Sequence, residues 1–327
     1  MSADAPPTKR RREEESDSDL PVTRSPAYWF EDGNIILQVE STQFRVTKSM
    51  LAMHSDVLRD MFLVPLPVNE PLVEGCHVVH LPGDTANDWT YLLEAMYPKI
   101  CFERKVTPAN LCAVLRLSHK YDCLAFRQEC TRRLKAEYPA TLKGYQKVMG
   151  QWTHMAPPKT SSGGHVQLVN TASELGLHSV LPSGFYQLTH SCLSESEDGG
   201  DIASQLAPAD QIRFWKGCAF LSNLHAKSKT PERLCFGPKT SCIPCASCQT
   251  PVACTARRAE LFDAALDSRL SARLFGGWKM SWSTNICAAC TAAARTACEQ
   301  AEEDSWNTLP SLFGLPSWEE LLKMDSE

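Results

Sequence analysis

Residues 28–62, YWFEDGNIILQVESTQFRVTKSMLAMHSDVLRDMF, change their hydrophobic period partway along. Apolar and polar side chains alternate through 35–40 and again through 43–47, which is the pattern of half-buried strands. From 48–62 the apolar residues instead recur at steps of three and four, as helices require, and Ser55 can cap the second of two helices. The stretch therefore predicts two strands followed by a helical hairpin.

The sequence that follows continues an α+β pattern. A short apolar run at 78–81 predicts a third strand. Residues 89–97 have the spacing of a buried helix face, and Pro98 ends that helix. A cap residue and a first-turn proline at 107–108 begin another helix, and further apolar stripes of helical period come after it.

This order of elements resembles the BTB/POZ domain. In that family a strand hairpin is followed by a basic residue, a leucine, a serine and a phenylalanine, and the residues that fit those places are Lys48, Leu51, Ser55 and Phe62. The resemblance covers residues 25–138 and implies a short β-sheet with helical hairpins. It also implies that the protein works by binding other proteins.

Details of the same region refine the resemblance. Thr47 replaces a histidine common in the family, and Asn34 stands nearest to the usual acidic residue, so the charged partner-binding pocket of some members is not expected here. The phrase at 30–34 looks most like the BTB proteins expanded in mushroom-forming (basidiomycete) fungi. In the family, the hairpin and first helix commonly build a homodimer. The helices corresponding to 85–135 commonly contact a cullin scaffold or another partner.

The composition favours an intracellular protein of about two domains. The 327 residues are 43% hydrophobic, which is enough for packed cores, and the net charge of −5 makes nucleic-acid binding an unfavoured function. No apolar run is long enough to span a membrane, and no secretory signal is evident. Without such a signal, the fifteen cysteines are not expected to form a disulfide framework. Five are predicted to be plain core residues of the BTB-like region: Cys76, Cys101, Cys112, Cys123 and Cys130.

Residues 1–24 are expected to be a disordered tail, because they combine blocks of charge with few apolar side chains. The tail contains a basic block that resembles a short nuclear localisation signal. Its members are Lys9, Arg10, Arg11 and Arg12. Because of this block, we expect a nuclear or nucleocytoplasmic protein. The alternative is a solvated, charge-patterned tail without a targeting role.

Residues 139–327 are expected to be mostly α-helical. Helical patterns occur at 141–155 and again at 208–224, where Ile212 and Trp215 belong to the apolar stripe. We expect these helices to pack against the first domain or to extend it.

The candidate chemical site is the cysteine-rich segment 235–298. Its cysteines form a first group, C-x2-C-x2-C-x5-C, and a C-x2-C pair about forty residues later. They are Cys242, Cys245, Cys248, Cys254, Cys287 and Cys290. Two C-x2-C pairs can close a tetrahedral four-thiolate site, which is the usual geometry of structural zinc.

Two ligand sets for zinc remain open. By spacing alone, the neatest site consists of Cys245, Cys248, Cys287 and Cys290. The commoner arrangement in the fungal relatives resembles a cysteine, five residues, a second cysteine and a later C-x2-C pair, which implies Cys254 in place of Cys245. The alternative to zinc is a set of reduced structural thiols, and Cys298 is such a thiol under either set. A bound zinc is expected to be structural, because four thiolates leave no open position for catalysis.

The run from Trp306 to Leu322 is unusually apolar for a terminus, and the residues from Ser317 to Glu320 fit a capping box. Such a tail either packs back onto the helical half or docks in a groove of a partner.

The sequence contains none of the common nucleotide-binding, metalloprotease or nucleophile-elbow motifs, so no enzyme activity is expected. We predict a BTB protein that self-associates and acts as an adaptor for a cullin-type ubiquitin ligase, with a C-terminal half that selects a client. The main alternative is a nuclear transcriptional regulator that recruits corepressors and has a zinc-stabilised C-terminal region. A third possibility is a scaffold that only oligomerises.

Overall fold

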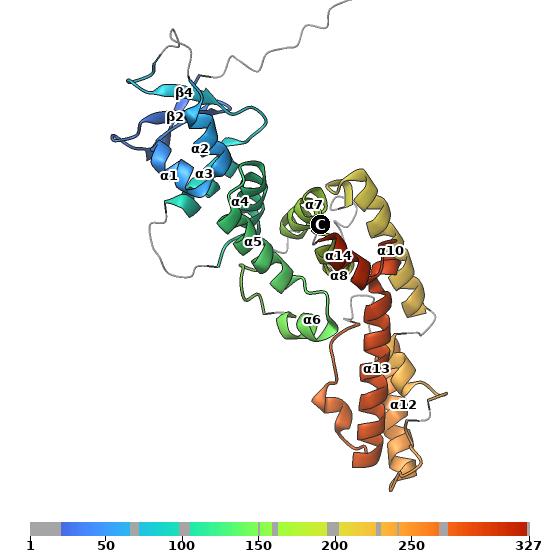
Figure 1. The fold of residues 1–327 in the computed structure, drawn as a ribbon. Helices are drawn as coiled ribbons and strands as arrows, with labels where there is room; N and C mark the ends of the chain where they lie inside the picture. The colour runs from blue at the N-terminus through green and yellow to red at the C-terminus, as the bar shows by residue number, and fades with distance from the viewer. Residues whose placement is uncertain are drawn as a thin grey trace, which may run out of the picture. The chain divides into compact units, whose positions relative to one another are not determined.

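The computed structural model describes residues 21–65, 72–97, 105–149, 151–158, 163–194, 203–226, 230–240, 242–267 and 274–325. The basic block Lys9–Arg12 and Cys101 lie outside these segments. The chain forms two compact units divided after Tyr97, and each is described by itself (Figure 1).

The first unit contains a four-stranded sheet in the order β1-β3-β2-β4. Its central hairpin, β2 (Ile35–Val39) and β3 (Thr42–Val46), is antiparallel, as the alternation predicted. β4 (His77–His80) pairs in parallel with β2 and confirms the third predicted strand. β1 (Thr23–Trp29) pairs in parallel with β3 on the other side, and the sequence analysis did not predict it.

Three helices accompany the sheet in this unit: α1 (Lys48–His54), α2 (Asp56–Leu63) and α3 (Ala86–Met96). They confirm the predicted helical hairpin and the helix after the third strand. Ser55 separates α1 from α2, and its hydroxyl accepts a hydrogen bond of 3.0 Å from the backbone N–H of Leu58. The predicted cap of the second helix is therefore present.

The second unit is built from helices, as the polar and apolar spacing predicted. They are α4 (Pro108–Lys120), α5 (Leu124–Glu137), α6 (Leu142–Val148), α7 (Gly163–Glu174), the 3-10 turn η1 (His178–Val180), α8 (Leu181–Ser194), α10 (Pro208–Ala226), α11 (Pro231–Phe236), α12 (Pro251–Asp267), the 3-10 turn η2 (Met280–Ser283), α13 (Ala288–Leu312) and α14 (Trp318–Met324). Among the described residues, no helix combines the length and the apolar character that crossing a membrane requires.

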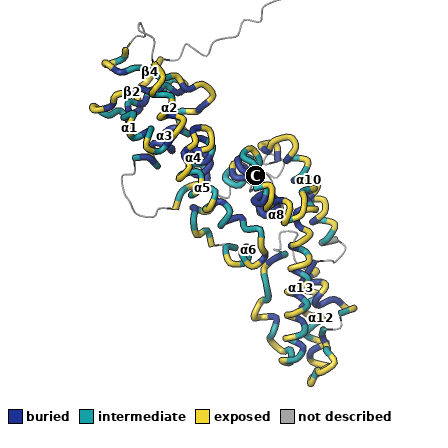
Figure 2. Tube along the Cα trace, viewed as in Figure 1, coloured by how far each residue is buried: buried dark blue, intermediate teal, exposed yellow. Residues whose placement is uncertain are grey.

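The main core of this unit surrounds α8. From Leu181 to Thr189 every residue of α8 except Gln187 is buried (Figure 2). Leu111 on α4 and Leu134 on α5 belong to the same core, together with side chains from α7, α10 and α13. Helices from the predicted first domain and from the predicted helical region thus share one hydrophobic core.

The predicted helix at 141–155 is shorter than expected, because α6 ends at Val148. The buried carboxylate of Glu137 accepts hydrogen bonds from the backbone N–H groups of Thr153, at 2.7 Å, and Met155, at 3.2 Å. These N–H groups are used by Glu137, so the chain after α6 does not continue as a helix.

Helix α10 confirms the helix predicted at 208–224, but a different face of it is buried. Phe214 is fully buried in the main core, whereas Ile212 is 61% exposed and Trp215 is 50% exposed. The helix packs against α8 and α13 through the Phe214 side, and the stripe that contains Ile212 and Trp215 is left in solvent.

The C-terminal run packs onto the main core of the same unit. The rings of Trp318 and Trp306 are stacked with centroids 5.4 Å apart, and Trp318 Nε1 donates to the backbone oxygen of Trp306. Ser317 and Glu320 form the predicted capping box at the start of α14. Beyond that helix, the Asp325 carboxylate pairs with Lys135 on α5 at 2.8 Å. Of the two alternatives for the tail, the structure therefore shows internal packing.

Candidate functional site

Four cysteine thiols meet where α12 and α13 begin. Their sulfur atoms all lie within 4.8 Å of one another, and they belong to Cys248, Cys254, Cys287 and Cys290. Cys248 lies in the turn before α12, and Cys254 lies in the first turn of that helix. Cys287 is the N-cap residue of α13, and Cys290 lies in its first turn. Two helix starts thus bring together residues that are about forty positions apart in sequence.

The spacing of these thiols fits a tetrahedral metal site. A zinc–sulfur bond of about 2.3 Å places the sulfurs of a regular tetrahedron about 3.8 Å apart. The Sγ atoms of Cys287 and Cys248 are 3.8 Å apart. The backbone N–H of Cys287 also donates to the sulfur of Cys254 at 3.3 Å. The cluster has the donor type, number and spacing that a structural zinc ion uses.

The structure brings Cys254, rather than Cys245, into the group of four. Cys245 lies outside that group, although its sulfur is 3.6 Å from the sulfur of Cys290. Near the cluster lies a small hydrophobic core that includes Phe236 and Trp282. Cys242 packs against this core. Cys298 is buried in that core, as expected for a structural thiol.

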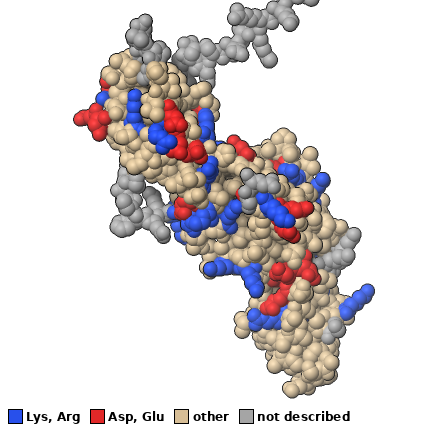
Figure 3. Space-filling model, in the orientation of Figure 1, with Lys and Arg blue, Asp and Glu red and all other residues tan. Residues whose placement is uncertain are grey.

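Few charged side chains lie near the thiols, and Arg257, which donates to the backbone oxygens of Thr284 and Ser281, is one of them. The sequence carries no Asp, Glu, Lys or Arg from 240–256 or from 280–294. Figure 3 shows correspondingly few charged side chains at the tip of the lobe that α12 and α13 form. Backbone N–H groups, first that of Cys290, hold the pKa of Cys287 at about 6, whereas burial raises the pKa of Cys290. One thiolate, that of Cys287, is therefore favoured near neutral pH, and a metal ion that bound here would displace the remaining protons.

A second candidate site is the exposed side of α1, α2 and the residue after α2 in the first unit, where apolar side chains lie among the charged Asp56, Arg59 and Asp60. Four of its side chains are largely in solvent: Met53 is 68% exposed, Val57 44%, Leu63 77% and Val64 62%. The opposite face of the hairpin is buried through Leu51 and Leu58. We call these four exposed residues the α1–α2 surface. Exposed apolar side chains gathered on one hairpin are typical of a protein-binding site.

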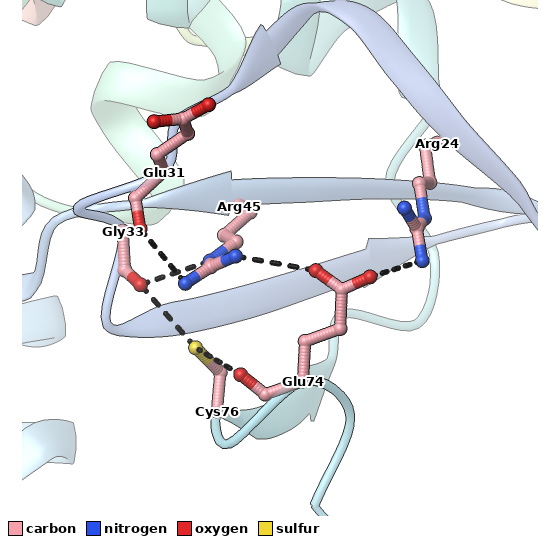
Figure 4. Close-up of polar contacts among 6 residues, drawn as sticks. All are labelled: Arg24, Glu31, Gly33, Arg45, Glu74 and Cys76. Carbon is pink, nitrogen blue, oxygen red and sulfur yellow. Dashed lines mark hydrogen bonds and ion pairs between the residues drawn. The ribbon is translucent and has the colours of Figure 1, made fainter.

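A polar cluster at the sheet fixes the loops of the first unit (Figure 4). The Arg45 guanidinium donates to the backbone oxygens of Gly33, at 3.0 Å, and Glu31, at 2.9 Å, and it pairs with Glu74 at 3.2 Å. Glu74 also pairs with Arg24. These bonds hold the turn before β2 and the short hairpin before β4 to the sheet, so we assign the cluster a structural role.

Asn34 has a structural role as well. Its side-chain oxygen accepts a hydrogen bond of 2.8 Å from the backbone N–H of Lys48, at the first residue of α1. The position that is usually acidic in the family therefore serves here to fix the start of a helix.

The sequence analysis missed the part of α13 that connects the cysteines to the main core. Apart from Pro310, the buried residues of this helix follow one another at steps of four and then three: Cys290, Ala294, Cys298, Glu302, Trp306 and Leu309. This regular stripe is visible in the sequence, but small and polar side chains make up most of it. Glu302 was missed because a charged side chain does not mark a buried helix face.

Comparison with known families identifies the first part of the chain. A family model for the BTB/POZ domain matches residues 31–138, so the chain contains a BTB/POZ domain. No curated protein matches the chain. The match includes α4 and α5, whose side chains belong to the core of the second compact unit. The mostly helical region that follows contains the cluster of four cysteines.

Proposed function

We propose that this protein is an adaptor that self-associates through the α1–α2 surface of its BTB/POZ domain and recruits a cullin-type ubiquitin ligase. BTB/POZ domains generally mediate self-association and the binding of other proteins. They are interaction modules and not catalytic domains, and the absence of enzyme activity elsewhere in the chain stays a prediction. In this proposal the helical region after residue 138 selects the client. That the chain is of the fungal kind, and its division at residue 138, also stay predictions.

The observation that carries self-association is the exposure of the α1–α2 surface. Each square ångström of apolar area removed from water contributes about 25 cal/mol. Single exposed apolar side chains are common, but here four of them occur within twelve residues. A second copy of the chain that covered the helical hairpin would remove these four side chains from water. BTB/POZ domains commonly dimerise through the strand hairpin and the first helix.

The oligomeric state tests this part of the proposal. Val57→Glu in the full-length protein would place a charge in the covered surface, and we expect it to convert a dimer to a monomer in sedimentation velocity. Ile212→Glu is the matched control, because Ile212 is an exposed apolar helix residue of the other unit. A wild-type protein that is monomeric at tens of micromolar would refute self-association. Equal changes in the sedimentation of the two variants would refute the α1–α2 surface as the interface.

The ligase partner needs a separate test. The helices at 85–135 commonly contact a cullin in the family, and Leu124, at the start of α5, is 52% exposed. We expect a cullin to co-purify with the cross-linked full-length protein and to be lost with Leu124→Glu, while Ile212→Glu retains it. If corepressor or chromatin proteins co-purify instead, the adaptor role fails and the transcriptional regulator is favoured.

The regulator remains the second candidate, because two features of the chain favour it. The block Lys9–Arg12 resembles a nuclear localisation signal, and the cysteine cluster would stabilise a C-terminal region. Nuclear or nucleocytoplasmic localisation stays a prediction. Replacing the four basic residues by alanine in a fluorescent fusion should reduce the nuclear fraction several-fold, and an unchanged fraction would remove this support.

We also propose that the cysteine cluster holds one structural zinc ion. Cys248, Cys254, Cys287 and Cys290 would bind it, and the ion would join the starts of α12 and α13. The purified full-length protein should contain one zinc per chain by elemental analysis. Cys254→Ser should lose most of it, whereas Cys242→Ser should keep it. If Cys254→Ser keeps the zinc and Cys245→Ser loses it, the ligand set chosen by spacing alone is the right one.

A further inference from the structure

One thiol outside the group of four, that of Cys245, lies against a member of the group. Cys245 lies in the turn between Cys242 and Cys248 and is partly exposed. Its sulfur is 3.6 Å from the sulfur of Cys290, and its backbone N–H donates to that same sulfur at 3.3 Å. The side chain of Ser247 is the other polar neighbour of the Cys245 sulfur, at 3.5 Å. A partly exposed thiol is thus held against a buried one.

We propose that Cys245 is a redox-reactive thiol that forms a disulfide with Cys290 and thereby removes a ligand from the metal site. This inference rests on the proposed zinc site for the release of the ion and for the protection of Cys248 and Cys287, which are also partly exposed. The disulfide itself requires just the two adjacent thiols. A disulfide bond is about 2.0 Å long, so the two sulfurs must approach by about 1.6 Å. Cys245 lies outside the helices, where the backbone can accommodate that shift.

The pairing follows from the different environments of the two sulfurs. Cys290 is completely buried, and in the proposed zinc site a metal ion would hold its thiolate. Cys245 is partly exposed and would be the uncoordinated thiol beside it, so an oxidant in solution reaches Cys245 before Cys290.

Hydrogen peroxide is the oxidant that we assign to this reaction. The Cys245 sulfur attacks one peroxide oxygen, the O–O bond breaks, and Cys245 becomes a sulfenic acid while water leaves. The Cys290 thiolate then attacks the Cys245 sulfur, the S–S bond forms, and hydroxide leaves. Two sulfurs are oxidised by two electrons in total, and one peroxide is reduced to water and hydroxide. A metal ion at the proposed site would then be held by only three thiolates, from Cys248, Cys254 and Cys287.

Peroxide treatment of the reduced, full-length protein tests the proposal with two readouts. A chromogenic chelator measures zinc release, and peptide mass spectrometry after alkylation maps the disulfide. We expect a disulfide between Cys245 and Cys290 and a simultaneous release of zinc in the wild type. Cys245→Ser should contain one zinc when reduced and should release it at least about tenfold more slowly. Cys242→Ser is the matched control and should behave like the wild type.

Three outcomes would overturn the proposal. They are a disulfide that maps to other cysteines, equally fast zinc release from Cys245→Ser, and a loss of zinc from reduced Cys245→Ser, which would make Cys245 a ligand. If the wild type contains no zinc, the proposed metal site fails separately. The disulfide map of the metal-free protein then still decides whether Cys245 and Cys290 react as a pair.

Discussion

Glu302 shows how one buried carboxyl group can hold several segments together. It is 2% exposed, and its two oxygens accept hydrogen bonds from the Gln146 side chain, at 2.8 Å, and from the backbone N–H of Gly277, at 3.0 Å. Burial, as the largest cause, raises the pKa of Glu302 to about 7, and the nearby carboxylates of Glu232 and Glu299 add to the shift. α13, α6 and the segment before η2 all meet at this one side chain.

The raised pKa of Glu302 predicts a pH-dependent stability. Its pKa in the unfolded chain is near the model-compound value of 4.5, so between about pH 4.5 and pH 7 the folded protein holds more protons there than the unfolded chain. The stabilising contribution of the protonated group is complete below pH 4.5 and is lost as the pH rises to about 7. Glu302→Gln remains uncharged and should therefore unfold with a free energy about 1–3 kcal/mol higher than the wild type at pH 8.

Thermal or urea unfolding at pH 5 and pH 8 checks this prediction. The difference between wild type and Glu302→Gln should be small at pH 5 and larger at pH 8. Glu303→Gln is the control, because Glu303 is an exposed residue of the same helix. A difference that is the same at both pH values would show that titration of Glu302 does not contribute.

The sequence could predict which residue types occur at the cysteine site but not which thiols meet. Spacing alone favoured Cys245, because two C-x2-C pairs are the simplest way to bring four sulfurs together. Cys254 joins the group because α12 begins at Pro251 and its first turn points that residue toward Cys287. Glu302 could not be identified as a buried group from sequence, since a glutamate in an acidic run such as 299–304 is usually exposed.

At the scale of elements, the hairpin β2–β3 and the helices α1 and α2 could be predicted because their patterns are local. Each depends on alternation or helical spacing within a few residues. β1 could not be predicted. It contains Pro26, which is unusual in a strand, and its pairing with β3 leaves no pattern in the local sequence. The α13 helix was missed because its buried stripe consists mainly of alanine, cysteine and glutamate, which do not mark an apolar face.

The packing of α14 gives a testable consequence at this scale. Trp318 stacks on Trp306, and Leu321 is fully buried. Trp318→Ala should remove that stacking and the hydrogen bond to the Trp306 backbone, and we expect it to lower the free energy of unfolding by about 2–4 kcal/mol. Chemical denaturation of the full-length protein measures the change.

Trp215→Ala is the matched control for this substitution. It removes the same side chain from α10, where Trp215 is half exposed and lies outside the main core. We expect a change below about 0.5 kcal/mol. If Trp318→Ala were as mild as Trp215→Ala, the C-terminal helix would not be held in the core, and the alternative of a tail that docks in a partner would return.

At the scale of the whole molecule, the family match and the compact units divide the chain at different places. The BTB/POZ match ends at residue 138, whereas the first compact unit ends at Tyr97. The reason is that α4 and α5 place Leu111, Leu115 and Leu134 in the main core of the helical region. The helices of each segment could be predicted from their own periodicity. The common core could not, because an apolar stripe shows that a helix face is buried but not which other helix covers it.

A chain that ends at residue 138 should therefore be much less stable than the full-length protein. It would retain the whole BTB/POZ match but would expose the core side chains of α4 and α5. We expect aggregation or a melting temperature lower by about 10 °C or more, because several fully buried leucines lose their cover. Differential scanning calorimetry of both chains measures this. A soluble fragment with the same melting temperature as the full-length protein would contradict the shared core.

The long helix α13 takes part in two cores at once. Its first turns belong to the small cysteine core and its last turns, from Trp306 onward, belong to the main one. A helix of this kind couples the stabilities of the two cores. If one core unfolds, the helix shortens, and the other core is left at its new, less stable end. An ion bound at the first turn would thus slow hydrogen exchange at the opposite end of the helix, some twenty residues away, without any movement of the folded chain.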